Sequence, residues 1–136
     1  MKYQAIKTEA VGVISGRDAI YLDEFKQIFD SKYNCIFKGE FNSILTEITS
    51  GKDFIPYTFS FSDVIYYQCC ELDLYINEKK LDSSFDLVCN SSLIQELKNG
   101  SISSKISEDH KHYVLQTYDY VFDIIAKDYK LVIENE

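Results

Sequence analysis

Hydrophobic positions in the first third of the chain repeat with the period of an α-helix. Within residues 15–34 one helical face would carry Leu22, Phe25, Ile28 and Phe29, and Asp18 stands where an N-cap is expected. Residues 39–51 repeat this spacing with Phe41, Ile44, Leu45 and Ile48, and Gly51 follows where a helix commonly ends. The sequence therefore predicts two N-terminal amphipathic helices, preceded by an extended segment over residues 2–14.

From residue 54 onward the hydrophobic period falls to two, which is typical of strands with one buried face. Residues 54–64 alternate aromatic with small polar side chains, and residues 71–76 place Leu72, Leu74 and Ile76 opposite charged or polar neighbours. A further strand is expected near residues 85–89. Residues 112–134 indicate two or three antiparallel strands, with turns near 118–119 and 127–128.

One short helix is expected near residues 92–98. Ser92 and Gln95 have the spacing of a capping box, and Gly100 follows as a stop signal. Together these patterns predict an α+β fold: a mainly antiparallel sheet, two N-terminal amphipathic helices and this short helix. With 136 residues, 46% of them hydrophobic and 15% aromatic, the chain is expected to form a single domain over residues 1–136.

The charge balance favours a basic partner. The net charge of −8 disfavours binding to nucleic acid or to an anionic membrane, because both require positive surface. The first residues contain an apolar run of only five, Ala10 to Ile14, which is too short for a signal peptide or a membrane span. We therefore expect a cytoplasmic protein.

Acidic and tyrosine residues concentrate in two segments that contain no lysine or arginine, residues 53–78 and 112–126. Tyrosine is enriched in protein interfaces, and exposed carboxylates attract a basic partner. If the two segments are neighbours in the fold, their outward residues would form one partner-binding surface. The candidates are Asp63, Tyr66, Glu71, Asp73, Tyr75, Tyr118 and Asp119.

The densest group of reactive side chains is "HKHYVLQTYDY", residues 110–120. His110 and His112 could begin a metal site, but zinc would need further ligands such as Glu108 or a cysteine. The other interpretation is a strand whose Tyr113 and Leu115 face is buried and whose His112 face is exposed. No glycine-rich phosphate loop is present, and we expect no cofactor and no catalytic activity.

A family resemblance supports a binding function. The segments "FSFSDVIYYQCCELDLYI", "SFDLVCNSSLIQEL" and "HKHYVLQTYDYVFDIIAKDYKLVI" resemble small bacterial immunity proteins, which are encoded beside toxins of contact-dependent inhibition or polymorphic systems. The resemblance covers about the last 80 residues. It implies a non-enzymatic inhibitor of a cognate toxin domain, and the acidic composition suggests a basic nuclease as that toxin.

Two other functions remain open on the sequence alone. One is a non-catalytic cytosolic module that binds a ligand or another protein. The other is a metal-assisted hydrolase that uses His110 and His112. An exposed edge strand would in addition allow two copies to pair as a homodimer.

Overall fold

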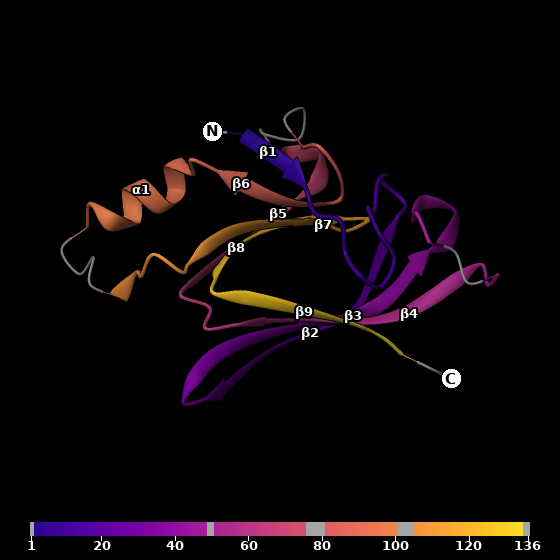
Figure 1. Ribbon diagram of the computed structural model, residues 1–136, viewed down its shortest axis with the longest axis horizontal. Coiled ribbons are helices and arrows are strands. Elements are labelled where there is room, and N and C mark those ends of the chain that lie inside the picture. Colours follow the sequence, from indigo (N-terminus) through magenta and orange to yellow (C-terminus); the bar gives the residue numbers. More distant parts are fainter. Residues whose placement is uncertain (1, 49–50, 76–80, 101–104, 135–136) are drawn as a thin grey trace.

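Two antiparallel sheets pack face to face in the computed structural model, which describes residues 2–48, 51–75, 81–100 and 105–134 (Figure 1). The five-stranded sheet has the order β1 (Lys2–Ala5), β6 (Phe85–Cys89), β7 (Lys111–Gln116), β8 (Tyr120–Ala126) and β5 (Tyr66–Glu71). The four-stranded sheet has the order β2 (Ile20–Asp30), β3 (Lys32–Asn42), β4 (Phe54–Ser62) and β9 (Asp128–Ile133). Every strand pair is antiparallel.

A bent two-stranded ribbon joins the two sheets. β4 pairs with β9 in one sheet, and their continuations β5 and β8 pair in the other. The chain turns between the sheets at Asp63, which adopts a left-handed φ of 52°, and opposite it at Lys127. The amide of Lys127 donates to the carbonyl of Ser62 at 3.0 Å, so the two strands stay hydrogen-bonded at the corner.

Aromatic side chains fill the space between the sheets. The alternation predicted for residues 54–64 is found in β4, where Phe59 and Phe61 are completely buried. The ring of Phe59 packs edge-on to Phe85 at a centroid distance of 4.8 Å, and Phe37 packs on Phe122 at 4.9 Å. These contacts join the four-stranded sheet to β6 and β8 of the five-stranded sheet.

The opposite face of the five-stranded sheet is also covered. A second apolar cluster forms there from Tyr3, Leu72, Tyr75, Val88, Val114 and Val121. Strands β7 and β8 are therefore buried on both faces, with Val114 1% and Leu115 0% exposed. The sequence predicted that the His112 face of this strand is exposed. That prediction is wrong, since the second cluster covers this face and His112 is only 4% exposed.

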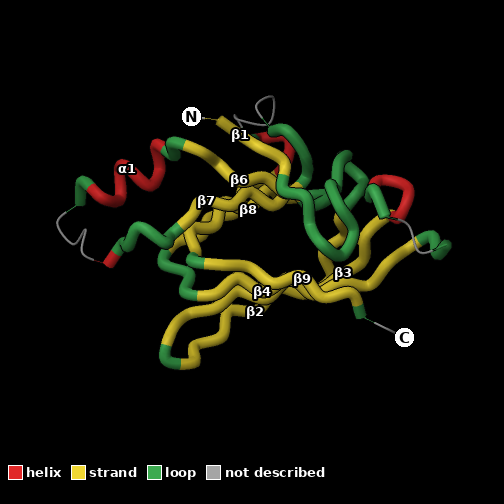
Figure 2. The backbone as a smooth tube through the Cα atoms, in the orientation of Figure 1, coloured by secondary structure: helices red, strands yellow, loops and turns green. Residues whose placement is uncertain are grey.

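The first predicted N-terminal helix is a strand. Residues 20–30 form β2, which turns back through Ser31 into β3 (Figure 2). Its pairing with β3 shifts register between Leu22 and Glu24. Such a bulge moves the side-chain alternation by one residue, so Leu22 and Phe25 both pack against the core. Their spacing of three residues imitates a helical period.

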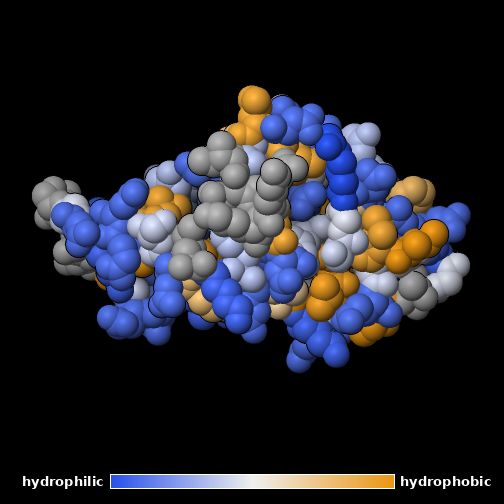
Figure 3. All heavy atoms as spheres, turned by 90° about the horizontal axis from the view of Figure 1, so that it is seen from above, coloured by the Kyte–Doolittle hydropathy of each residue, from blue (hydrophilic) through white to orange (hydrophobic). Residues whose placement is uncertain are grey.

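The second predicted helix is also absent from the residues of 39–51 that the structure describes. β3 continues to Asn42, and only the 3-10 turn η1 (Ser43–Leu45) follows, capped by the Asn42 side chain, which accepts from the amide of Ile44. Ile44 and Ile48 are 82% and 52% exposed, so they do not share a buried face. In the view from above, much of the apolar surface lies on the right-hand side, which is the side of the β4 label in Figure 1 (Figure 3).

A short turn also replaces the strand predicted over residues 71–76. β5 ends at Glu71 and the 3-10 turn η2 (Leu72–Leu74) follows, while Ile76 lies outside the described residues. The helix α1 (Ser92–Lys98) spans the predicted range, but its N-cap is Ser91 rather than Ser92. The predicted α+β class is therefore wrong: the described residues form two antiparallel sheets with one α-helix and two 3-10 turns.

Candidate protein-binding surface

The seven predicted surface residues occupy three separate places. Glu71, Asp73, Tyr118 and Asp119 come together where β5 ends and β7 turns into β8. Asp63 and Tyr66 lie at the opposite end of β5, at the corner between the sheets. Tyr75 is only 6% exposed and belongs to the second apolar cluster, so it is not available to a partner.

Backbone hydrogen bonds join the turn η2 to the β7–β8 turn. Glu71 is the register partner of Tyr120, and the amide of Leu72 donates to the carbonyl of Asp119 at 2.8 Å. The Glu71 carboxylate accepts from the amide of Asp73 at 2.9 Å and so caps η2. The order of strands in the sheet thus places acidic residues from two distant segments beside each other.

Thr117 fixes the conformation of the β7–β8 turn. Its hydroxyl accepts from the amide of Tyr120 at 3.1 Å and donates to the carbonyl of the same residue at 2.8 Å. Tyr118 and Asp119 at the tip are exposed. The amide of Tyr118 donates to the carbonyl of Ile20 at 2.9 Å, which attaches the turn to the first residue of β2.

The beginning of β2 contributes residues that the sequence did not indicate. The ring of Tyr21 stacks on Tyr118 at 5.5 Å and meets the edge of Phe54 at 6.1 Å. Asp18 and Asp23 on either side of it are exposed. The sequence predicted a helix here, and even a correct strand prediction would not have shown that Tyr21 lies beside a turn of the other sheet.

We define the acidic patch as the surface formed by these turns and the beginning of β2. Its members are Arg17, Asp18, Tyr21, Asp23, Phe54, Glu71, Asp73, Leu74, Tyr118, Asp119 and Tyr120. It carries five carboxylates and one guanidinium, so five negative charges less one positive leaves four negative. The guanidinium belongs to Arg17 and forms an ion pair with Asp73 at 3.0 Å.

A hollow of about 240 Å³ lies within the acidic patch. Its lining combines three tyrosine rings with two carboxylates: Tyr21, Leu22, Asp23, Thr117, Tyr118, Asp119 and Tyr120. Burial and the neighbouring Asp18 raise the pKa of Tyr21 above its usual value. Tyrosine faces and carboxylates both attract cations, so this hollow suits a lysine or arginine side chain.

Asp63 has a structural role at the corner. Burial alone would raise its pKa, but Lys127 at 3.1 Å and Lys32 at 3.3 Å outweigh that effect, and the pKa is lowered. The carboxylate is therefore charged and already paired. Tyr66 lies nearby at the start of β5 and donates its hydroxyl to Gln68 Oε1 at 2.8 Å.

The buried residues Tyr75 and His112 share one carboxylate. Tyr75 donates its hydroxyl to Asp123 Oδ1 at 3.2 Å, and His112 Nε2 lies 2.7 Å from the same oxygen. His112 Nδ1 lies 2.7 Å from the Ser91 hydroxyl, which also accepts from the amide of Ile94 as the N-cap of α1. This chain of hydrogen bonds attaches α1 to the five-stranded sheet.

A serine, an imidazole and a carboxylate in series is also the arrangement of serine hydrolases. Here Ser91, His112 and Asp123 are each at most 5% exposed, and the Ser91 hydroxyl is engaged in capping the helix. We therefore interpret the series as a structural network.

The two histidines of the sequence motif do not converge on one site. Both ring nitrogens of His112 are occupied by Ser91 and Asp123. His110 accepts from the amide of Ser107 through Nδ1, and its Nε2 lies 3.9 Å from Asp63 Oδ1. Within the described part of the chain, no group of three or more His, Cys, Asp or Glu side chains is arranged to hold a metal ion.

Among the residues that the structure describes, no helix has both the length and the apolar character needed to cross a membrane.

Comparisons with protein-family models, with curated protein sequences and with solved structures find no match to this chain.

Proposed function

We propose that this chain is an immunity-type protein that binds and neutralises a basic bacterial toxin domain through its acidic patch. The observation that carries the proposal is the hollow between β2 and the β7–β8 turn, where Asp23 and Asp119 stand beside three tyrosine rings. A basic side chain of the partner would enter this hollow. The sequence led to the same expectation, through the resemblance of about its last 80 residues to small immunity proteins.

The charge around the hollow favours a basic partner over other kinds. Four net negative charges on one surface attract positive proteins and repel phosphate-bearing ligands. A nuclease has such a positive surface because it binds phosphates. In this proposal the carboxylates accelerate the encounter, and the tyrosines provide the contact area that slows dissociation. The protein would act in the cytoplasm, where a nuclease meets its substrates.

Co-expression with the protein encoded beside this gene tests the proposal. The wild-type chain should restore growth to cells that produce the neighbouring toxin domain, and the two proteins should co-purify. Tyr118→Ala should weaken binding by about 2 kcal/mol, because it removes one of the rings that line the hollow. The matched control is Glu96→Gln, which neutralises an exposed carboxylate on α1, outside the acidic patch.

Two results would contradict the proposal. Growth arrest that persists in the presence of the wild-type chain would exclude neutralisation. Binding that Tyr118→Ala and Glu96→Gln leave equally unchanged would place the interface on another surface. A small ligand that binds the chain while no neighbouring protein does would favour the alternative function, a non-catalytic binding module.

A further inference from the structure

A second cavity lies at the other end of the strands that carry the acidic patch. It has a volume of about 590 Å³, more than twice the 240 Å³ of the hollow in the patch. β2 runs from Tyr21 in the patch to Phe29 in the cavity wall, a span of roughly 25 Å at the usual rise of a strand. The cavity is therefore separate from the surface proposed to bind the toxin.

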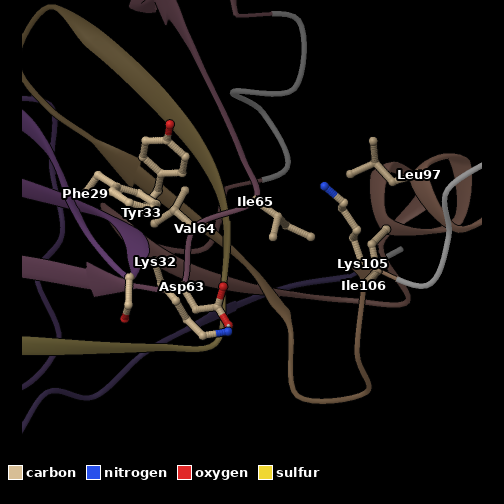
Figure 4. A pocket seen from close by; sticks show the side chains of 10 residues that line it. Phe29, Lys32, Tyr33, Asp63, Val64, Ile65, Leu97, Lys105 and Ile106 are labelled. Atoms are coloured by element: carbon tan, nitrogen blue, oxygen red, sulfur yellow. The ribbon is translucent and has the colours of Figure 1, made fainter.

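Three parts of the chain form the cavity wall. The tip of the β2–β3 hairpin provides Phe29 and Tyr33, and the corner between β4 and β5 provides Val64 and Ile65. The third part comprises Leu97 of α1 and the two residues Lys105 and Ile106 (Figure 4). The apolar side chains of all three parts border one space.

The aromatic rings of the hairpin are left open to solvent. Phe29 and Tyr33 are 64% and 50% exposed, and their ring centroids lie 4.7 Å apart. Large apolar groups exposed together at the rim of a hollow commonly mark a binding site. A volume near 590 Å³ is within the usual range for sites that take a small molecule.

The charge at the cavity is positive, although the whole chain is strongly acidic. Among the described residues of the wall, Asp63 is the only one with a carboxylate, and its oxygen already pairs with Lys32 at 3.3 Å and Lys127 at 3.1 Å. Lys105 is exposed and forms no ion pair with another described residue. Its side chain extends toward the space between Ile65 and Leu97 (Figure 4). An anionic head group is the complement of this lysine.

We propose that this cavity binds an amphipathic carboxylate, an aliphatic chain that ends in one negative charge. The chain would pack on Val64, Ile65 and Leu97 and under the ring of Phe29, while the carboxylate would pair with the ammonium group of Lys105. A free phosphate would leave the apolar side chains of the wall uncovered, and the lysine gives a carboxylate preference over an uncharged chain.

Calorimetric titration of the full chain with dodecanoate tests the proposal, with dodecanol as the uncharged comparison. Lys105→Met keeps an apolar stem and removes the charge, and it should weaken dodecanoate binding by about threefold to fivefold. The matched control is Lys38→Met, which removes an exposed charge on β3 outside the cavity wall. Phe29→Ser should weaken the binding of both ligands, because it removes part of the apolar wall.

Several outcomes would overturn the proposal. These are no heat of binding with the wild-type chain, equal affinity for dodecanoate and dodecanol, and equal losses in Lys105→Met and Lys38→Met. Binding to phosphatidylglycerol vesicles without binding to dodecanoate would mean that the cavity contacts a lipid surface instead. Asp119→Asn in the acidic patch should leave dodecanoate binding unchanged, so this test is independent of the proposed toxin interface.

Discussion

His112 Nε2 lies 2.7 Å from Asp123 Oδ1 in the interior of the protein, and neither side chain is more than 6% exposed. The carboxylate also accepts from the Tyr75 hydroxyl and from the Gln68 side chain. His112→Ala leaves one buried oxygen without this partner and releases Ser91 from the imidazole. We expect a loss of roughly 1–3 kcal/mol in the free energy of unfolding, measured by urea denaturation.

Lys130→Ala provides the control for this measurement, because Lys130 is exposed on β9. The urea concentration at which Lys130→Ala is half unfolded should stay close to that of the wild-type chain. An unchanged midpoint for His112→Ala would show that the imidazole does not contribute to the stability of the fold.

Gly39 permits the close approach of β2 to β3 beside the acidic patch. A Cβ atom at this position would overlap the carbonyl oxygen of Tyr21, which accepts from the Tyr57 hydroxyl at 2.9 Å. Gly39→Ala must therefore push the strands apart, at a cost of roughly 1–3 kcal/mol. Thermal denaturation should show a lower midpoint for Gly39→Ala and little change for Ser60→Ala on the half-exposed face of β4. Equal midpoints would contradict the observed packing.

His110 should make the fold less stable in mild acid. Burial lowers the pKa of its imidazole below the usual value, and this effect exceeds the opposite influence of Asp63. The unfolded chain therefore binds a proton more readily, so stability should fall as the pH drops below about 6.5 toward the lower pKa of the folded state. His110→Asn should reduce this slope in urea titrations at a series of pH values. An identical slope in wild type and variant would exclude the effect.

Asp63 should govern a different pH range. Lys127 and Lys32 hold its pKa below the usual value against the effect of burial. The ionised carboxylate therefore contributes stability above about pH 4, and this contribution is lost as the pH falls through the lower pKa of the folded state. Asn tolerates the left-handed φ of this position, so Asp63→Asn should fold, be less stable at neutral pH and lose less stability below pH 4. The same loss in both proteins between about pH 4 and pH 2 would contradict this assignment.

β5 was not predicted, and the strand expected over residues 71–76 is the 3-10 turn η2 instead. β4 could be predicted, because it has one buried face and a regular alternation. β2 could not, because its bulge between Leu22 and Glu24 changes the phase of the alternation. The exposure of His112 was also mispredicted. A strand pattern shows which residues share a face, but it does not show that a second layer with Tyr75 covers the outer face of the sheet.

The acidic patch could be predicted in part. Glu71 and Asp119 were identified from segments without lysine or arginine, and the pairing of β5 with β8 brings them together. Tyr21 and Asp23 were missed because their proximity to Tyr118 depends on where β2 begins relative to the other sheet. The periodicity of hydrophobic residues shows which side chains share a face of one strand, but it does not show how one sheet is placed on the other.

The proposed interface can be tested by measuring the rate of association with the neighbouring toxin domain at two ionic strengths. Reversing Asp23 and Asp119 to lysine changes both carboxylates of the hollow, and Glu96→Lys makes the same change on α1. The double variant should associate more slowly and with a weaker dependence on salt, whereas Glu96→Lys should stay close to the wild type. Association of the double variant at the wild-type rate and with the wild-type salt dependence would contradict the proposed interface.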